Sequence, residues 1–367
     1  MRAYVVLAVT WSLLSCAGCA SWPGSGARPE PVAFNHPEEV IRGQGFMVLA
    51  DRRVFAVMAF LNAVGLDEEY PGTQMHPVRI RVRQLVADNL ASHREKVESW
   101  RRYYKANKLD FYYYQDFALS LSADYPFRRI HQDTDLGYVF PVAKFRNFAE
   151  ILNDFWRTAH LDEVWRRVQP DYAAELRKYD FARMTQQMAS LWKYLRMSRQ
   201  DTLMLVNVPN LLDKHYRAIW ARYGSHYYTV ESPGSHSYGL NIHEYLHSIV
   251  NPIVKAHPRT VKTTVRQYYE AGKDKPIVEP YREPVAFTCE CLVRALDHRL
   301  AVLQTGDPAE KKRIEGQVAW ETEKGLTLTQ PFYRLLEQYE ESDQPFDRFF
   351  LTMLERLPSI PDHTGTE

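Results

Sequence analysis

The chain has 367 residues, of which 45% are hydrophobic and 25% charged, and its formal net charge is +1. This composition is typical of a globular protein with a sizeable core, in one large domain or two smaller ones. The near-neutral charge argues against a nucleic-acid partner, and four unevenly placed cysteines exclude a disulfide scaffold.

The N-terminal segment has the layout of an export signal. A short positive start is followed by an apolar run over 4–14 and then by small residues. The run is too short to span a bilayer as a stable helix. Residues 13–16 read Leu-Leu-Ser-Cys and resemble the bacterial lipobox, in which the cysteine becomes the lipidated first residue. Cys16 is therefore the expected lipidation site, Cys19 offers a second register, and a plain signal cut near Ala20 is the alternative.

These features predict how the protein is located. We expect residues 1–19 to be the signal and 20–35, rich in Gly, Pro and Ser, to be a flexible tether. The protein is then exported to the bacterial cell envelope as a periplasmic lipoprotein. Its contact with the membrane is expected only through the N-terminal lipid anchor.

The next region, 36–200, is predicted to be helical. Apolar residues recur at mixed spacings of three and four, and the last segment also carries many charges, as a solvated helix face would. The segments are Arg53–Val64, Pro77–Ala91, Phe111–Ser122, Phe145–Ala159 and Tyr172–Leu195.

The pattern changes near residue 200, where a subdomain boundary is expected. Thr202–Val208 is a short apolar run before a proline and predicts a buried strand, and His226–Val230 predicts another. A few strands ahead of a helical stretch indicate an α+β fold, mostly helical, with a small sheet before the next helix. The strand at His226–Val230 is a candidate for pairing with an extended peptide substrate.

The helix after these strands contains an HExxH motif at 243–247. Side chains four residues apart lie on one helix face, about 5–6 Å apart at Cβ. The imidazoles of His243 and His247 can therefore bind one metal ion from the same side. Glu244 points roughly 100° round the helix, so we expect it to act on a water as a general base, not to bind the metal.

Two neighbours of the motif allow other interpretations. Asn241 followed by Glu244 resembles a capping box, which would use the glutamate structurally. Asn251, one turn beyond His247, either supports that ligand or ends the helix. Pro252 is expected to kink or end the helix. Uncharged flanks, the preceding strand and the export signal favour a metal site.

A catalytic zinc ion needs a third protein ligand and an open position. The metzincin pattern requires Gly at 250 and His at 253, but the chain has Val250 and Ile253, which excludes that class. A glutamate from a following helix is the other common solution. The candidates are Glu270, Glu279, Glu283 and Glu290.

Glu290 is the favoured third ligand. It lies inside a helix predicted from about Pro284 to Leu303, on a partly buried stripe, and a buried carboxylate needs a cation. Glu283, just before that helix, is the next choice. Arg294, four residues after Glu290, can neutralise it as an ion pair, orient it as a metal ligand, or do both.

The segments 243–252 and 290–295 (Glu-Cys-Leu-Val-Arg-Ala) together resemble a family of bacterial exported proteins known as a domain of unknown function. Its members look like gluzincin zinc metallopeptidases. The resemblance covers about residues 40–350 and is sharp over 230–300. It implies a zinc peptidase-like fold with the glutamate at 290 as third ligand. We therefore expect a zincin-like catalytic region over 201–357, followed by a disordered tail over 358–367. It implies no substrate.

These features predict a zinc-dependent hydrolase, most simply a metallopeptidase with a peptide or protein substrate. His243, His247 and Glu290 would hold Zn²⁺, and Glu244 would activate the zinc-bound water. The alternatives are a non-catalytic zinc-binding module, a metal-free helical envelope scaffold, and a hydrolase of another amide or ester. Candidate oxyanion donors are His236, Tyr238, Tyr268, Tyr269 and Tyr281.

Overall fold

The computed structural model describes residues 40–66, 69, 71–130, 142–197, 204–223, 225–235, 239 and 241–358. The predicted signal with Cys16 and Cys19, the tether and all but the first residue of the tail lie outside these residues. The described part is mostly helical and contains one five-stranded mixed sheet, which confirms the predicted α+β class. None of its helices is both long and apolar enough to span a membrane.

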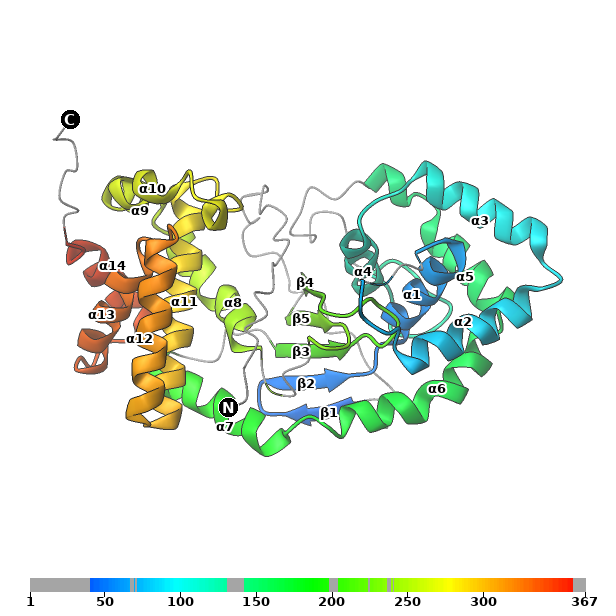
Figure 1. Cartoon of the computed structure of the whole chain (residues 1–367), viewed down its shortest axis with the longest axis horizontal. Coiled ribbons are helices and arrows are strands. Elements are labelled where there is room, and N and C mark those ends of the chain that lie inside the picture. Colours follow the sequence, from blue (N-terminus) through cyan, green and yellow to red (C-terminus); the bar gives the residue numbers. More distant parts are fainter. Residues whose placement is uncertain are drawn as a thin grey trace. The chain divides into compact units, whose positions relative to one another are not determined.

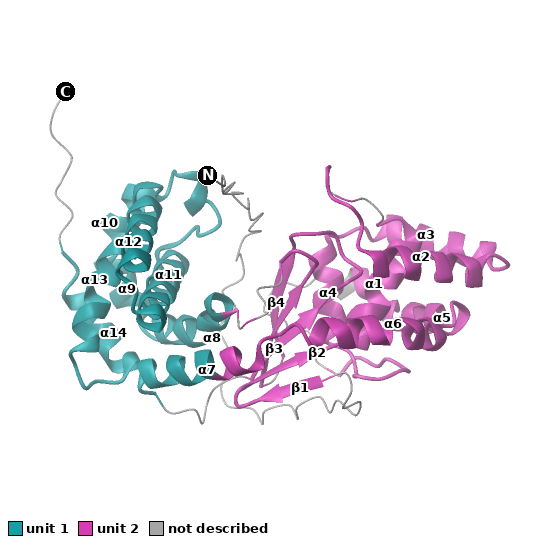
Figure 2. Ribbon diagram, turned by 60° about the horizontal axis from the view of Figure 1, so that its bottom comes forward, with its two compact units in different colours: residues 1–19, 186–202, 242–367 teal, residues 20–185, 203–241 magenta. Residues whose placement is uncertain are grey.

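The chain forms two compact units, coloured in Figure 2. Unit 1 comprises residues 1–19, 186–202 and 242–367, and unit 2 comprises 20–185 and 203–241. The division does not follow a single boundary near residue 200. The reason is that strands after that point pair with a strand near residue 46, so the sheet joins two distant parts of the chain.

The sheet of unit 2 has the strand order β1-β2-β3-β5-β4 (Figure 1). β2, β3 and β5 are parallel to one another, while β1 and β4 are antiparallel edge strands. The strands are β1 (Val40–Gly43), β2 (Phe46–Leu49), β3 (Met204–Pro209), β4 (Ala218–Tyr223) and β5 (His226–Glu231).

Burial explains which strands the sequence revealed. β3 and β5 are buried along almost their whole length, as parallel strands usually are, so they appear as continuous apolar runs. Both were predicted, and both are confirmed. β5 lies between β3 and β4 and has no free edge, so the prediction that it pairs with a peptide substrate is wrong.

The helices of unit 2 pack aromatic side chains into a dense core. Phe60, Phe148 and Phe155 meet edge to face, with ring centroids 5.3 to 5.4 Å apart. The helices are α1 (Arg52–Val64), α2 (Pro77–Leu90), α3 (Arg94–Ala106), α4 (Phe111–Leu119), η3 (Val142–Phe145), α5 (Phe148–Thr158) and α6 (Leu161–Leu176). Four of the five predicted helices are confirmed to within a few residues, and α3 was not predicted.

The predicted helix Tyr172–Leu195 is instead two helices. α6 ends at Leu176 and α7 (Phe181–Leu195) begins a few residues later. The Asp180 carboxylate accepts a hydrogen bond from the Arg183 backbone N–H at 2.9 Å, which satisfies a donor at the start of α7. An aspartate that caps the start of a helix, within a periodic apolar pattern, was therefore the sequence signal that a new helix begins there.

Unit 1 is built around the long helix α11 (Pro284–Thr305), which packs against α8, α12 and α13. Pro284 starts α11, and Gly306 ends it in a left-handed conformation with φ of 61°. The other elements are α8 (Ile242–Lys255), α9 (Pro258–Thr264), α10 (Arg266–Gly272), η5 (Pro276–Val278), α12 (Pro308–Glu323), α13 (Thr329–Glu340) and α14 (Phe346–Glu355). Pro252 lies inside α8, which continues for three residues beyond it to Lys255.

Candidate metal site

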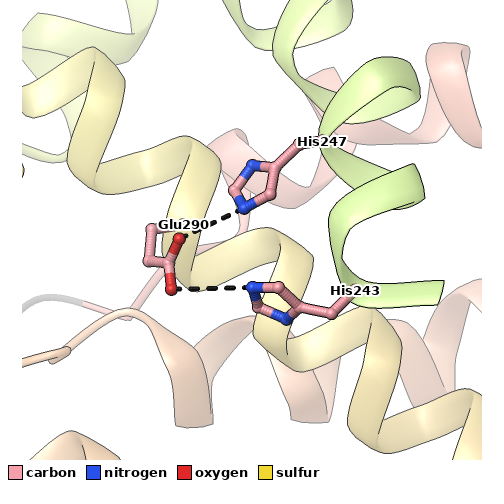
Figure 3. A group of neighbouring side chains, drawn as sticks. All are labelled: His243, His247 and Glu290. Carbon is pink, nitrogen blue, oxygen red and sulfur yellow. Dashed lines mark ion pairs between the residues drawn. The ribbon is translucent and has the colours of Figure 1, made fainter. Parts of the chain in front are cut away.

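The packing of α8 against α11 brings the HExxH histidines to Glu290, all within unit 1 (Figure 3). His247 Nε2 lies 3.3 Å from Glu290 Oε2, and His243 Nε2 lies 3.9 Å from Glu290 Oε1. One nitrogen or oxygen from each of the three side chains lies within 4.8 Å of the others, so the group could hold a metal ion. We call these three residues the metal cluster.

The other three candidate glutamates form ion pairs elsewhere. Glu270 pairs with Lys273, Glu279 with Arg282 and Glu283 with Lys262. Their side chains are 37% to 66% exposed, whereas that of Glu290 is only 3% exposed. Burial on a helix facing α8 therefore distinguishes Glu290 from the alternatives.

Glu290 is a buried carboxylate that remains charged. Burial by itself raises the pKa of a carboxyl group, but the charge of Arg294 and the contacts with His247 and His243 outweigh it and hold the pKa of Glu290 well below its usual range. Arg294 Nε donates to Glu290 Oε1 at 2.6 Å. The predicted contact between these two side chains is thus present, and it keeps a negative charge facing both imidazoles.

Each imidazole has an oxygen atom beside its distal nitrogen. His247 Nδ1 lies 3.3 Å from Asn251 Oδ1, and His243 Nδ1 lies 3.8 Å from Asp297 Oδ2. The acceptor at His247 Nδ1 favours a proton there, so Nε2 can offer its lone pair to a cation in place of the proton it shares with Glu290. The contact of His243 with Asp297 is longer than a hydrogen bond. Two imidazole nitrogens and a carboxylate that converge in this way could together hold a metal ion.

The two histidines differ in their tendency to hold a proton. Burial lowers the pKa of His243 to about 3, so this ring is neutral at neutral pH. Burial also lowers the pKa of His247, but its hydrogen bond to Glu290 and the charge of Glu290 raise it above the ordinary value overall. A cation at the metal cluster would take the place of that proton, because both need the Nε2 lone pair.

Glu244 lies on α8 next to His243, and only 6% of its surface is exposed. Burial raises the pKa of Glu244 to about 7, against the opposing charge of His247. A carboxyl group with that pKa can both accept and return a proton near neutral pH. The structure thus places a titratable group beside the metal cluster, where the sequence predicted the general base.

The candidate oxyanion donors are not equivalent. Tyr268 donates its hydroxyl to the Pro358 carbonyl, and Tyr269 stacks edge to face on Phe287. Tyr281 is 7% exposed and lies beside Glu290 and Arg294, where burial and the charge of Glu290 raise its pKa. His236 and Tyr238 lie outside the described residues. Of the described candidates, only Tyr281 has ionic neighbours in the metal cluster.

Besides Asp297, three polar side chains near the site were not predicted from the sequence. Glu321 of α12 accepts from Arg294 Nη1 and from Gln317 Nε2, each at 3.1 Å. His298 Nε2 lies 3.1 Å from the other Glu321 oxygen. His298 follows Arg294 by four residues, a spacing visible in the sequence. Glu321 reaches the site only through tertiary packing, and nothing in the sequence marked it.

The chain was also compared with protein-family models, with curated proteins and with solved structures, and none of them matches it. The chemistry of the site must therefore be argued from its own geometry. That geometry comprises two imidazoles and one carboxylate that could hold a cation, with a second buried carboxyl group on the same helix as the imidazoles. Such an arrangement can polarise a bound group and transfer a proton to or from it.

Proposed function

We propose that the chain is a zinc-dependent hydrolase and that peptide-bond hydrolysis is the activity its site supports best. The observation that carries the proposal is the metal cluster itself, with donor atoms of His243, His247 and Glu290 within 4.8 Å of one another beside the buried Glu244. Two imidazoles and a carboxylate suit zinc, whereas calcium and magnesium are usually held by oxygen ligands. A purely structural zinc site would be closed by four protein ligands, and this group provides three.

The residues of the site divide the chemistry among them. His243, His247 and Glu290 would hold the ion, which supplies Lewis acidity and makes a water more acidic. Glu244 takes the proton from the attacking water and returns it to the leaving nitrogen.

Proton return favours a peptide over an ester as the substrate. An amine is a poor leaving group until its nitrogen is protonated, so amide hydrolysis needs a group that can act as an acid after it has acted as a base. Glu244 is suited to that second step because it is buried and lies next to His243 on α8. The resemblance of segments 243–252 and 290–295 to gluzincin-like proteins supports the same activity.

The wider context of the proposal is a zincin-like catalytic core in an exported lipoprotein. Unit 1 contains the complete metal cluster, so we assign the catalytic core to it. Lipidation of Cys16, or of Cys19 in the second register, would hold the protein at the cell envelope. The rival proposal is a zinc-binding envelope module without catalysis.

The decisive experiment measures bound metal and peptide cleavage on the same preparations. The wild-type chain and Glu244→Gln, purified without chelator, should each carry close to one zinc ion. A His243→Ala/His247→Ala variant should carry none. Peptide turnover should fall about 10²- to 10⁴-fold in Glu244→Gln, because the base is lost while the metal remains.

His257→Ala is a matched control, because His257 lies in the same unit and its ring packs against Phe350, outside the metal cluster. It should keep both zinc and activity. Zinc without cleavage of any peptide would favour the non-catalytic module. Absence of zinc from the wild type, even after zinc is offered, would overturn the proposal.

A further inference from the structure

Arg294 lies between two buried carboxylates on neighbouring helices. Its Nε donates to Glu290 Oε1 at 2.6 Å, and its Nη1 donates to Glu321 Oε1 at 3.1 Å. Glu290 and Glu321 expose only 3% and 2% of their surfaces. A planar guanidinium makes both bonds at once in a fixed fork geometry, whereas a lysine ammonium would be a point charge on a flexible stem.

Glu321 is itself held in place on its other sides. Its Oε1 accepts from Gln317 Nε2 at 3.1 Å, and its Oε2 lies 3.1 Å from His298 Nε2. If Arg294 moved away, a buried carboxylate would lose its guanidinium partner, which is strongly unfavourable. Arg294 is therefore held in place by a carboxylate on α12 that is not part of the metal cluster.

The two oxygens of Glu290 consequently differ. Oε1 accepts the short, charge-assisted bond from Arg294, which engages a lone pair and draws electron density toward the guanidinium. Oε2 faces His247 Nε2 at 3.3 Å. Oε1 also lies 3.9 Å from His243 Nε2, but because Arg294 engages it, Oε2 is the better donor toward a cation at the metal cluster.

We propose that Arg294, anchored by Glu321, is a positioning residue that makes Glu290 bind the metal through Oε2 alone. The inference rests on the proposed metal site and adds a rule about its coordination. One-oxygen binding limits the protein to three donor atoms and leaves the fourth position for water. A glutamate without this arginine could bind through both oxygens, as carboxylates often do, and the second oxygen would occupy the position that water needs.

Cobalt(II) provides a test that does not depend on activity, because its visible absorption weakens as its coordination number rises. The full chain, Arg294→Met and Glu321→Gln would each be titrated with Co²⁺ alone. The wild type should give the strong absorption of a four-coordinate ion. Arg294→Met should still bind Co²⁺, but its absorption should fall by roughly half or more as Glu290 adds its second oxygen. Glu321→Gln should change in the same direction by less.

Arg299 is a matched control on the same helix. It donates to Glu337 Oε1 and to Glu340 Oε1, each at 2.8 Å, and its side chain is 6% exposed. It thus bridges two carboxylates as Arg294 does, but neither belongs to the metal cluster. Arg299→Met should destabilise the protein and leave the cobalt spectrum unchanged, which separates positioning from a general loss of packing.

An Arg294→Met spectrum identical to the wild type would overturn the inference, and so would loss of Co²⁺ from a folded Arg294→Met chain. If that variant fails to fold, Glu321→Gln decides by the same spectral change. A wild-type chain that binds no Co²⁺ would instead refute the metal site on which the inference rests. The expected spectral change without any peptide cleavage would support the inference and count against the proposed hydrolase.

Discussion

Two carboxyl groups, one in each unit, are equally buried and yet have opposite pKa shifts. Glu290 of unit 1 and Asp116 of unit 2 are each 3% exposed. The pKa of Glu290 lies well below its usual range, whereas burial raises the pKa of Asp116 to about 7. Burial favours the neutral form of both groups, so the difference must come from their partners.

The partners differ in charge. Glu290 accepts a hydrogen bond from the Arg294 guanidinium at 2.6 Å and faces two imidazoles. Together these contacts lower its pKa by more than burial raises it. Asp116 accepts a hydrogen bond from the Tyr223 hydroxyl at 2.6 Å, and with the charge of Arg129 this only partly offsets burial. The charged carboxylate of Glu290 could therefore bind a cation. The one with the raised pKa instead connects α4 to β4.

The largest effect is expected from removing the charge of Glu290. Glu290→Gln keeps the shape of the side chain but loses the anionic ligand. Loss of a group that only supports a metal ligand weakens metal binding by up to about 100-fold, so loss of the ligand itself should lower zinc affinity by more than that. Metal analysis of the purified variant should find almost no zinc. Asp116→Asn, at an equally buried carboxyl group, should retain it. Full zinc occupancy in Glu290→Gln would show that Glu290 is not a ligand.

Because its pKa is raised, Asp116 should stabilise the fold at low pH and lose that contribution as the pH rises, whereas a carboxylate with a lowered pKa loses its contribution as the pH falls. The folded chain binds this proton more tightly than the unfolded chain, whose Asp pKa is 3.8. The stabilisation is complete below pH ~4 and is lost as pH rises through about 7, which amounts to roughly 3 kcal/mol between pH 5 and 8.

Asp116→Asn removes the titrating group and should remove this contribution. Urea unfolding of both proteins at pH 5 and pH 8 measures it as the change in their stability difference. The asparagine variant should gain relative to the wild type as pH rises. A difference that stays constant between the two pH values would contradict the assignment.

The smallest effect is expected at the distal nitrogens of the two histidines. Removing the oxygen acceptors with Asn251→Ala or Asp297→Ala should weaken zinc binding about 10-fold, the lower end for groups that orient metal ligands. Asp297 should matter less, because its contact is longer, at 3.8 Å, and its side chain is 41% exposed. Competition with a chelator measures both, and unchanged affinity in Asn251→Ala would show that this contact does not orient His247.

Much of the candidate site could be predicted, because its relations are local in the sequence. The spacing of His243 and His247 places both on one helix face, and the same four-residue rule placed Asn251 and Arg294 near their partners. The positions of Asp297 and Glu321 were not predicted, and neither was the position of Tyr281, among the candidate oxyanion donors, beside Glu290. They depend on how α8, α11 and α12 pack, and no short-range pattern encodes that packing.

The fold divides in the same way. The periodic segments predicted α1, α2, α4 and α5 closely, and the apolar runs predicted β3 and β5. The two short N-terminal strands and β4 were missed, since a strand of four residues or one with a half-exposed face gives a weak signal. The error at β5 arose because a run of apolar residues indicates burial but does not identify the neighbouring strands.

The sequence by itself determined the HExxH helix and the class of fold, and helical spacing selected His243 and His247 as a candidate pair of metal ligands. Only the tertiary structure decided that β5 is an internal strand and that Glu290, alone among four glutamates, lies within reach of the histidines. It also decided that Arg294 connects Glu290 to Glu321. The physical reason is range: helix geometry fixes neighbours three and four residues apart, whereas contacts between elements depend on how complete hydrophobic faces pack.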